Sequence, residues 1–563
     1  MTTQAEVPPT ITVPEGFRLH SENTSHILLP DDNGAFLNPV QEFNRDMSVA
    51  CIRTWGEQTN EFKKQKWEQA RERKAQKLAN RAKRQKLDGS EDVAMAGPSA
   101  GEQAVESTEG KSSEQPAQEK TETQPLQYTP QKFIILEALS ATGLRSIRYA
   151  KEISSVKYVI ANDLSPSAAE AMRRNVELNG LGPTPATDVS ADTSADGAQK
   201  PQTADNGKVR VNEGDAWCVT ESFKISVFVI ENFLSALMYN HRSGKDRVDV
   251  VDLDPFSNYG GMPVKAEYCH EVALRLALNT ISNSAARYGR YIQPLLSLSI
   301  DFYIRVFVRV TTAPVEVKKL ASKTAMYYVC SNCQSFYEQP LGRVVEKVNE
   351  SNGNVNTLYK VHAGPPVSNH CPECNSVLHI AGPMWAGPLH DKEFVSKVLE
   401  HVENNEDSYG TVTRMKGMLT VAKEELPTPF YFTPSKVAGM FHCECPPLDD
   451  VASAILHAGY DISRSHACAG SLKTTATRAD IHDIFRSWVK KHPVRMDKIS
   501  ETSPARVLLA KEPKSEANFA HHPKSVTSSS KVKLVRYQQN PLPNWGPAAK
   551  AKSGKRKRDG DEA

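Results

Sequence analysis

The stretch KFIILEALSATGLRSIRYAKEISSVKYVIAND, residues 132–163, decides the fold class of this chain. It opens and closes with mostly apolar runs, residues 132–139 and 156–162, which have the length and composition of buried strands of a parallel sheet. Between them a Ser-Ala-Thr-Gly turn, residues 140–143, leads into a helical stretch, residues 144–153. A strand, a helix and a second strand in this order predict a βαβ unit.

The same alternation continues along the chain. Ser165 and Pro166 are placed to start a helix that runs to Leu178, because serine is a favoured N-cap and proline suits the first helical position. Two further strands are predicted at residues 208–212 and 248–253. We therefore expect an α/β fold with a mostly parallel, doubly wound sheet.

All four predicted strands end in a polar turn: residues 140–143, Asp163, Asp215 and Asp254 follow them in chain order. Ligands of open parallel sheets bind at the carboxyl ends of the strands, so these groups are expected to share one crevice. A single carboxylate in this place is usually a helix cap. Three at successive strand ends favour a ligand site.

The spacing of the first turn and the first carboxylate favours a nucleoside cofactor. Asp163 lies 20 residues after Gly143, the distance at which such folds place an acid on a ribose diol. The turn has one glycine instead of the three of a dinucleotide fingerprint, so S-adenosylmethionine, which has no pyrophosphate, fits better. Asp215 is then expected near the adenine amine. Arg145 is either a partner of the methionine carboxylate or a surface helix arginine.

Length and composition exclude other classes. The chain has 563 residues, 39% hydrophobic and 24% charged, which is enough for two or three domains once polar stretches are set aside. It has no run of about 18 apolar residues and no signal-peptide pattern, so no membrane association is expected. The ten cysteines should therefore be free, buried or metal-bound in a reducing compartment.

Charge is segregated, although the formal net charge is only +3. Residues 61–88 carry eleven Lys or Arg against four acids, residues 89–130 are acidic, and a basic cluster occupies Lys555–Arg558. Such blocks suit nucleic acid or nuclear import. For residues 61–88 the alternative is a solvated basic helix. The cluster at Lys555–Arg558 favours import into the nucleus.

Two Cys-x2-Cys pairs indicate a metal site. Cys330 and Cys333 are separated from Cys371 and Cys374 by 37 residues, and Ser351–Asn354 between the pairs is a plausible hairpin turn. Four thiolates in a tetrahedral array typically hold structural zinc, with no open position for water. The alternative is four unrelated buried thiols.

The sequence resembles the tRNA (guanine-26-N2)-dimethyltransferase family in several motifs. FLNPVQEFNRD (36–46) resembles the family's N-terminal motif, and NPLPNWGP (540–547) is similar to a tail motif of eukaryotic members. Five further strings carry the resemblance: LEALSATGLRSIRYA (136–150), NDLSPSAAEAMRRNVELNG (162–180), VDVVDLDPF (248–256), YGGMPVKAEYCHEVALR (259–275) and YGRYIQPLLSLSIDFYIRVFVRV (288–310).

The resemblance implies a Rossmann-type, class I methyltransferase domain followed by a family-specific α/β C-terminal domain. The implied reaction dimethylates the N2 amine of guanine 26 in tRNA with S-adenosylmethionine. Matching of motifs places the cofactor on Arg45, Arg145, Asp163, Asp215 and Ala216. It places Asp254 at the guanine amine, with the base between Phe36 and Phe256.

The chemistry of an exocyclic amine agrees with these residue types. Its lone pair is delocalised into the ring, so a carboxylate that accepts its hydrogen bond directs the lone pair and can take the released proton, an effect worth about 10²–10⁴ in rate. Pro255 fixes the backbone after Asp254, and Phe256 offers a stacking face for an extruded base. Asp252 is expected to support the site instead of performing the chemistry.

These patterns divide the chain into five expected parts. Residues 1–55 are an N-terminal substrate and cofactor motif, which begins irregularly over residues 1–25, and residues 56–130 are a disordered charged linker. Residues 131–310 are the methyltransferase domain, with a low-complexity insertion at 183–208. Residues 311–500 are a C-terminal tRNA-binding domain with the four-cysteine zinc site, and residues 501–563 are a disordered basic tail.

The C-terminal part has its own helical pattern. Helices are predicted at residues 449–460 and 479–491, and a buried helical stripe is formed by Val395, Val398, Leu399 and Val402. Between the two helices lies a loop with four basic residues, Arg464, His466, Lys473 and Arg478. This loop either grips tRNA phosphates within a winged-helix-like unit or belongs to a packing domain.

Two stretches depart from the family pattern. Members continue after Asp-Pro-Phe with a glycine, a helix and a fifth strand, whereas residues 256–258 run directly into 259–261, so on the order of forty residues are absent. Conversely, residues 218–235 have no counterpart. We interpret both as errors of intron removal. If the chain is real as written, the fourth strand has an exposed edge and the guanine pocket is incomplete.

Two other functions stay open from the sequence. An Asp-Pro-aromatic turn serves any exocyclic amine, so the substrate is alternatively adenine in DNA or RNA. The chain is alternatively a catalytically impaired tRNA-binding isoform. The expected compartment is the nucleus, with the mitochondrion or cytoplasm as further sites.

Overall fold

The computed structural model describes residues 11–31, 37, 41–88, 127–183, 206–214, 248–253, 266–300, 303–351 and 353–531. The chain divides into two compact units. One comprises Trp55–Phe133, and the other comprises Met1–Thr54 together with Ile134–Ala563. The units are described separately below.

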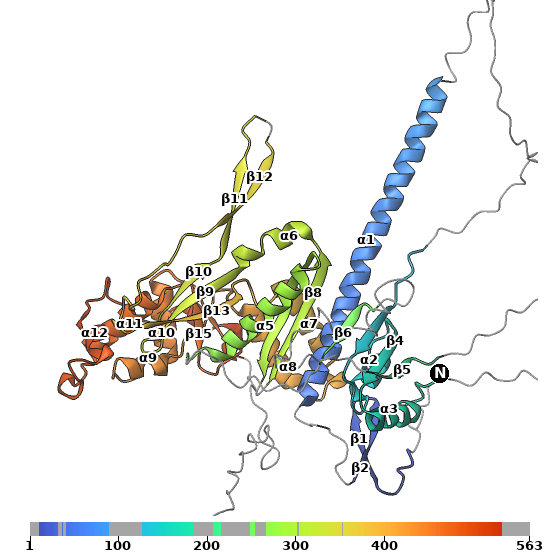
Figure 1. The fold of residues 1–563 in the computed structure, drawn as a ribbon, viewed down its shortest axis with the longest axis horizontal. Helices are drawn as coiled ribbons and strands as arrows, with labels where there is room; N and C mark the ends of the chain where they lie inside the picture. Colours follow the sequence, from blue (N-terminus) through green and yellow to red (C-terminus); the bar gives the residue numbers. More distant parts are fainter. Residues whose placement is uncertain are drawn as a thin grey trace, which may run out of the picture. The chain divides into compact units, whose positions relative to one another are not determined.

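A four-stranded sheet lies at the centre of the N-terminal half of the larger unit (Figure 1). In chain order its elements are β3 (Phe133–Glu137), α2 (Leu144–Glu152), β4 (Val156–Asp163), α3 (Pro166–Leu178), β5 (Val209–Glu213) and β6 (Val250–Asp252). The strand order is β5-β4-β3-β6, and the pairs β4–β5 and β3–β6 are parallel. These are the strands and helices that the apolar runs predict, in the predicted α/β arrangement.

The turn before α2 depends on a glycine. Gly143 has a φ of 78°, in the left-handed region that side chains rarely adopt. A Cβ at this position would lie 3.2 Å from Cγ of Met172 on α3. The glycine therefore lets the chain turn from β3 into α2 while α3 packs closely against the turn.

An antiparallel hairpin, β1 (Phe17–Glu22) and β2 (Ser25–Pro30), precedes the sheet. The expectation of irregular structure over residues 1–25 is therefore wrong for this segment. Asparagines of α3 hold the hairpin: Asn175 Oδ1 accepts from the amide of Leu28 at 2.9 Å, and Asn179 Oδ1 accepts from that of His26 at 3.1 Å. The hairpin was missed because its stabilising partners lie about 150 residues later.

After the sheet come α5 (Cys269–Ala286) and two long antiparallel strands, β7 (Arg290–Ile300) and β8 (Tyr303–Thr312), which form a sheet of their own. In the described ranges the four-stranded sheet ends at β6, where Val251 and Leu253 are each 38% exposed. This is the edge beside which the family resemblance predicts a further strand.

The C-terminal half contains a three-stranded sheet of order β10-β9-β13 and a hairpin, β11–β12 (Figure 1). Their bounds are β9 (Thr324–Cys330), β10 (Phe336–Pro340), β11 (Gly342–Val348), β12 (Val355–Val361) and β13 (Leu378–Trp385). A smaller hairpin pairs β14 (Ile462–Arg464) with β15 (Leu472–Thr474). The helices are α6 (Pro314–Lys318), α7 (Lys392–Asn404), α8 (Val412–Glu424), α9 (Pro434–Met440), α10 (Leu448–His457), α11 (Arg478–Lys491), α12 (Pro504–Ala510) and α13 (Ser528–Lys531).

Several predictions for this half can be compared directly. The helices expected at 449–460 and 479–491 are confirmed as α10 and α11. The predicted stripe of valines and leucine is the buried face of α7. The expectation of a disordered tail from residue 501 is wrong up to residue 531, because the short apolar segment of α12 buries Leu508 in the core. The tail beyond it, including Lys555–Arg558, lies outside the described residues.

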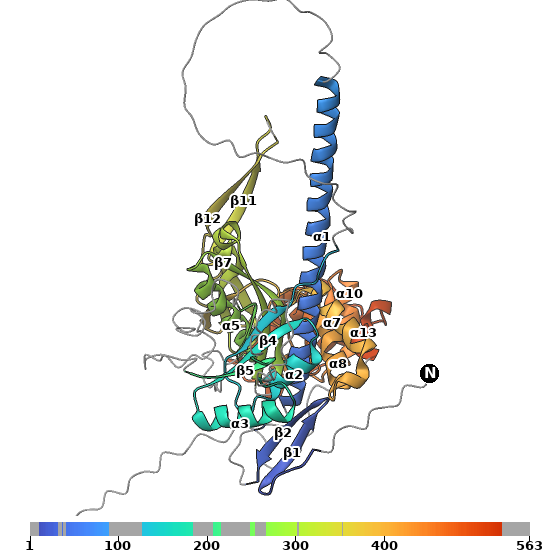
Figure 2. The same ribbon diagram turned by 90° about the vertical axis from the view of Figure 1, so that its right-hand side faces the viewer.

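The smaller unit is dominated by α1, a 47-residue helix that spans Glu42–Asp88 and so begins in the larger unit (Figure 2). The prediction of a disordered linker over residues 56–130 is therefore wrong for residues 56–88. Their lysines, glutamines, arginines and alanines favour helix without apolar periodicity, so the pattern gave no core-facing signal. Inside this unit Trp67 contacts Tyr128 at 6.0 Å between ring centroids, and Lys63 Nζ donates to Gln131 Oε1 at 2.8 Å.

Among the described helices, none combines the length and hydropathy that a membrane crossing requires.

Candidate active site

Backbone hydrogen bonds gather the carboxyl ends of the four parallel-sheet strands at one edge. The amide of Ser140 donates to Asn162 O at 2.8 Å, which joins the ends of β3 and β4. The amide of Gly214 donates to Asp163 O at 3.0 Å, and that of Ala138 donates to Asp252 O at 3.0 Å, which add β5 and β6. The carboxyl ends of the four strands therefore lie side by side at this edge, as the sequence predicts.

Asp163 organises the turn that follows β3. Its Oδ2 accepts from the amide of Ala141 at 2.9 Å, and its Oδ1 accepts from the amide of Ser165 at 3.0 Å. The side chain is half-buried. A carboxylate has about four lone-pair sites, so two remain for a ligand hydroxyl. The N-cap residue of α3 is Ser165, so Asp163 is not the N-cap of this helix.

A buried carboxylate, Asp252, connects three elements just before the Asp-Pro-Phe turn. Arg145 Nη1 donates to its Oδ2 at 3.1 Å, Tyr149 OH donates to the same oxygen at 2.5 Å, and Arg305 Nη2 donates to Oδ1 at 2.6 Å. Burial alone would raise the pKa of Asp252, but the guanidiniums of Arg305 and Arg145 hold it well below its usual range. Its two arginine partners therefore favour the charged form of Asp252.

A second buried carboxylate lies beside it. Glu137, the last residue of β3, accepts a hydrogen bond from Ser146. Burial raises the pKa of Glu137 to about 7, and the negative charge of Asp252 acts in the same direction while Arg145 opposes it. Two neighbouring carboxyls in one protein core therefore have opposite protonation preferences.

Arg45 belongs to a separate buried network at the start of α1. Its Nε donates to Glu22 Oε2 at 2.8 Å. Arg148 Nη1 lies 3.3 Å from the same oxygen, and its Nη2 lies 2.7 Å from Asp46 Oδ1. Burial alone would raise the pKa of Glu22, but its bonds to His20 and Arg45 lower it to about 2. The network connects α1, which carries Arg45, to α2, which carries both Arg145 and Arg148.

The structure places only some of the predicted site residues. Arg45, Arg145 and Asp163 lie as given above. The others are outside the described residues: Phe36, Asp215, Ala216, Asp254 and Phe256. The segments that lead to Asp215 and Asp254 are described up to Gly214 and Leu253, at the strand ends that the backbone bonds connect.

The sequence analysis singled out none of six residues of these networks: Glu22, Asp46, Glu137, Arg148, Tyr149 and Arg305. Glu22 stands in a stretch that looked irregular, and Arg305 stands 53 residues after its partner Asp252. Tyr149 lies on the buried face of α2, where an aromatic residue is usually core. The only available signal was the alternation of β8, IRVFVR, in which arginines occupy positions of a half-buried strand.

The four cysteines of the two Cys-x2-Cys pairs meet in the C-terminal half. Sγ of Cys330 lies 3.4 Å from that of Cys374, and Sγ of Cys333 lies 3.5 Å from that of Cys371. All four are buried, and their sulfur atoms lie within 4.8 Å of one another. The hairpin β11–β12, whose turn lies at the predicted position, returns the chain from the first pair toward the second. Four buried thiols at these separations fit a single tetrahedral ion.

The two pairs have the same local geometry. The amides of Cys330 and Cys371 donate to Ser335 O and Ser376 O at 2.8 and 2.7 Å. The residue after the second cysteine, Gln334 or Asn375, has a positive φ of 57° or 60° and donates back to the first cysteine's carbonyl. Such repeated tight turns present two sulfurs each in a fixed direction, which supports a built site over four unrelated thiols.

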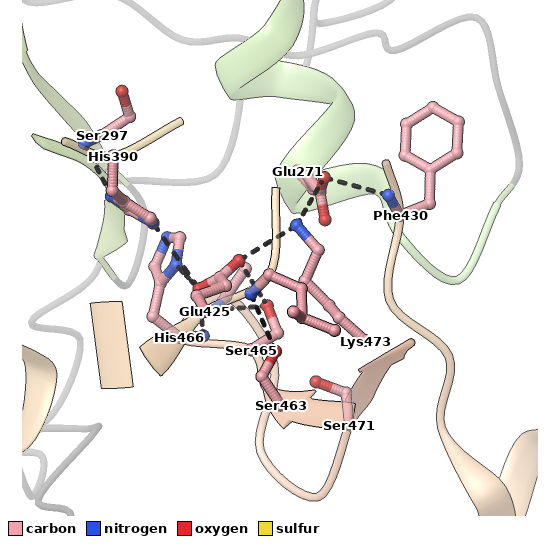
Figure 3. Close-up of polar contacts among 12 residues, drawn as sticks. Glu271, Ser297, His390, Glu425, Phe430, Ser463, Ser465, His466, Ser471 and Lys473 are labelled. Atoms are coloured by element: carbon pink, nitrogen blue, oxygen red, sulfur yellow. Dashed lines mark hydrogen bonds and ion pairs between the residues drawn. The ribbon is translucent and has the colours of Figure 1, made fainter. Parts of the chain in front are cut away.

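The basic loop predicted as a phosphate grip is mostly buried, and Figure 3 shows two of its basic side chains, His466 and Lys473, directed toward Glu425. Lys473 Nζ lies 3.1 Å from Glu271 Oε1 and 3.3 Å from Glu425 Oε1. His466 Nδ1 lies 2.6 Å from Glu425 Oε2, and Arg478 Nη1 lies 3.4 Å from Glu267 Oε1. These basic side chains pair with internal carboxylates, so of the two interpretations the packing domain is correct for these three residues. Arg464 is half-exposed.

Two histidines in this cluster are held in one tautomer. The amide of Ser297 donates to His390 Nδ1 at 3.3 Å, and the amide of Ser299 donates to His466 Nε2 at 3.2 Å (Figure 3). Each ring therefore carries its proton on the nitrogen that faces Glu425. Ligand atoms of His390, Glu425 and His466 lie within 4.8 Å of one another, and Glu425 also pairs with the ammonium of Lys473.

Comparison with known proteins adds the following. The sequence profile of the family described as N2,N2-dimethylguanosine tRNA methyltransferase matches residues 16–198 and 254–486. The chain is 38% identical to the tRNA (guanine(26)-N(2))-dimethyltransferase of Schizosaccharomyces pombe, over 95% of this chain and 92% of that protein. It is 36% identical to the mitochondrial enzyme of Saccharomyces cerevisiae, over 95% and 92%, and 34% identical to the human enzyme, over 95% and 78%.

A solved structure has a similar fold. It is the complex of Trm1 from Pyrococcus horikoshii with S-adenosyl-L-methionine, which is 20% identical in sequence and superposes with a TM-score of 0.50 over 82% of this chain and 98% of that one. Among the predicted cofactor residues, Asp215 and Ala216 fall between the two ranges matched by the family profile.

Proposed function

Because the chain belongs to the N2,N2-dimethylguanosine tRNA methyltransferase family, we propose that it dimethylates the N2 amine of guanine 26 in tRNA with S-adenosylmethionine as methyl donor. The observation that carries this proposal is the similarity to enzymes of that activity over 95% of the chain. The strand ends support it, because they meet at the edge of the sheet where such folds bind ligands.

We assign the cofactor to Arg45, Arg145, Asp163, Asp215 and Ala216. Asp163 has lone pairs left for a ribose diol after it has accepted two backbone amides. Arg145 is already oriented by Asp252, and a guanidinium has further donors for a carboxylate. The residues present therefore fit the group. When bound, S-adenosylmethionine supplies an electrophilic methyl group on a sulfonium.

The residues of this chain then handle the base and its proton. Phe36 and Phe256 hold the guanine by stacking, and the Asp254 carboxylate accepts a hydrogen bond from N2. As N2 forms its bond to the methyl carbon and the carbon–sulfur bond breaks, Asp254 takes the proton that N2 releases. The fixed charge of Asp252 two residues earlier, with its Arg145 and Arg305 partners, keeps the turn in place.

The four-cysteine site is proposed to hold structural zinc. Its donor set is all sulfur and buried, which favours zinc, and four protein ligands leave no position for a catalytic water. The ion would fasten the second cysteine pair to β9, whose last residue is Cys330. Residues 131–310 are then the methyltransferase domain, and residues 311–500 the zinc-bearing tRNA-binding domain. We place the enzyme in the nucleus, from the basic cluster Lys555–Arg558.

The test is mass analysis of guanosine products after the full chain is incubated with tRNA and labelled cofactor. Dimethylguanosine is expected with wild-type tRNA and none with tRNA in which guanine 26 is replaced by adenine. Undiminished labelling of that substituted tRNA would contradict the proposal and indicate another base. The variant D254A should lose transfer and keep its calorimetric affinity for S-adenosylmethionine. Retained turnover would remove Asp254 from the mechanism.

Calorimetry also distinguishes the proposed enzyme from the remaining alternative, an isoform without catalytic activity. A catalytically impaired isoform binds tRNA tightly and does not bind the cofactor, whereas the proposed enzyme binds both.

A further inference from the structure

The helix α1 concentrates its positive charge on one face. At 3.6 residues per turn, seven basic positions of its second half fall within an arc of about 100°. These positions, hereafter the basic stripe, are Lys63, Lys66, Arg73, Lys74, Lys77, Arg81 and Arg84. Of the four acids of residues 61–88, Glu61, Glu68 and Glu72 fall in an arc of about 40° on the opposite face, and Asp88, at the end of the helix, falls within the arc of the stripe. At 1.5 Å per residue the stripe is about 32 Å long.

Most of the basic side chains of the stripe are exposed to solvent. Side chains over residues 61–80 are exposed, with Trp67 half-buried. Among the described side chains, no acid forms an ion pair with Arg73, Lys74 or Lys77. The ammonium of Lys66 lies 4.3 Å from the centroid of the Phe62 ring, a contact that leaves its charge unneutralised. Lys66, Arg73, Lys74 and Lys77 therefore form a row of exposed cations that have no acidic partner among the described side chains.

The described side chains of residues 61–80 form no apolar face that a protein partner could bind. Its large apolar residues, Phe62 and Leu78, are single exposed side chains (56% and 59%) that do not form a stripe. A partner helix or an apolar groove needs apolar anchors at helical spacing, which are absent from the described side chains of this segment. A straight row of cations without apolar anchors matches a polyanion, and nucleic acid backbones are polyanions with regularly spaced charges.

We propose that the basic stripe of α1 is a phosphate-binding arm for the tRNA substrate. The inference rests on the proposed function, which supplies the RNA. The contacts are to phosphates, so the stripe positions tRNA and adds affinity, while base selection stays with the pocket. Figure 1 shows α1, the helix that carries the stripe, as one continuous helix. Binding through the stripe must depend on salt, because each phosphate contact releases counterions.

The experiment compares two variants of the full chain that remove the same charge. The stripe variant is K66Q/R73Q/K74Q/K77Q, and the matched control is K64Q/R71Q/K83Q/K86Q, whose positions lie off the stripe. Glutamine is a good helix former, so both should keep α1, which circular dichroism checks. Affinity for tRNA is measured between about 50 and 200 mM salt, with methyl transfer at saturating tRNA as a second readout.

The stripe variant should lower the slope of log K against log salt by about 3 to 4, whereas the control should change it by less than about 1. Its transfer rate at saturating tRNA should stay within about twofold of wild type, because the pocket is untouched. Equal slopes for the two variants would overturn the inference. So would unchanged tRNA affinity with loss of nuclear accumulation, which would make the stripe an import signal. Failure of the proposed function would appear differently, as a wild-type chain that transfers no methyl group.

Discussion

Arg145, near the start of α2, and Asp252, the last residue of β6, form a buried ion pair across 3.1 Å. Asp252 also accepts from Tyr149 and Arg305, so one carboxylate holds two guanidiniums in a core position. It stands two residues before Asp254 in the chain. The same carboxylate therefore holds the end of β6 and Arg145, for which we propose a role in cofactor binding.

Substitution of Asp252 by asparagine should destabilise the fold and weaken the cofactor site. D252N removes the carboxylate that pairs with the buried Arg145 and the half-buried Arg305, and loss of one partner of a buried pair typically costs about 3–5 kcal/mol of unfolding free energy. Urea denaturation measures the loss, and calorimetry should show weaker binding of S-adenosylmethionine. The control is R173Q, which breaks the exposed pair Arg173–Glu213 and should cost less than about 1 kcal/mol. Equal stability of the two variants would mean that the Asp252 network is not stabilising.

Glu137 should make stability fall as pH rises. Its pKa is about 7 in the folded protein and 4.5 in the unfolded chain, so folding favours the protonated form. This contribution is complete below pH 4.5 and is lost as pH rises through 7, with a total of at most about 3 kcal/mol. E137Q cannot titrate, so it should gain stability relative to wild type between about pH 5 and 8 in urea titrations. E213Q, at an exposed carboxylate, is the control, and parallel pH curves for E137Q and wild type would refute the assignment.

The parallel sheet was predictable because its strands bury both faces. Runs such as residues 132–139 and 156–162 are mostly apolar, and the turns between them contain Gly143 and Ser165, whose roles are local. The site was predictable to the same extent, since strand ends of a parallel sheet share one edge. The cofactor roles of Arg145 and Asp163 stay predictions, whereas the clustering of the four cysteines was predicted by their spacing.

What failed depended on contacts between distant residues. Lys473 reads as a surface cation, yet its partners Glu271 and Glu425 lie 202 and 48 residues away. The hairpin β1–β2 is held by asparagines of α3 about 150 residues later. The helical course of residues 56–88 was missed for the opposite reason. That segment is helical through local propensity, with no apolar face for a core to recognise.

Zinc should be found bound to the purified chain. About one equivalent is expected by elemental analysis, held by the four thiolates. C371S should lose the metal and lower the melting temperature, because metal binding at such sites contributes folding free energy directly. C445S, at an exposed thiol outside the cluster, should change neither value. A metal-free wild type as stable as the loaded protein, or C371S with full zinc content, would contradict a structural ion.

Transcripts should differ from the printed sequence between codons 218 and 262. The described sheet ends at β6 with exposed apolar residues, and the family profile skips residues 199–253. A missing strand and helix after Phe256, and an intron read as residues 218–235, account for both observations. Sequencing of cDNA across this region should add about forty codons after Phe256 and remove the extra segment. Confirmation of the printed junctions would reject this interpretation.

Lys473 should be essential to the core of the C-terminal half and irrelevant to RNA. Burial alone would raise the pKa of Glu425, but His466 and Lys473 hold it well below its usual range. K473M would leave Glu425 and Glu271 buried with less compensation, so a loss of about 3–5 kcal/mol is expected in urea denaturation. K473R, which keeps the charge, should lose less, because only the fit changes. R464Q, at the half-exposed neighbour, should stay within about 0.5 kcal/mol of wild type. The salt dependence of tRNA affinity should be the same for K473R and wild type, and a reduced slope in K473R would instead assign Lys473 to phosphate binding.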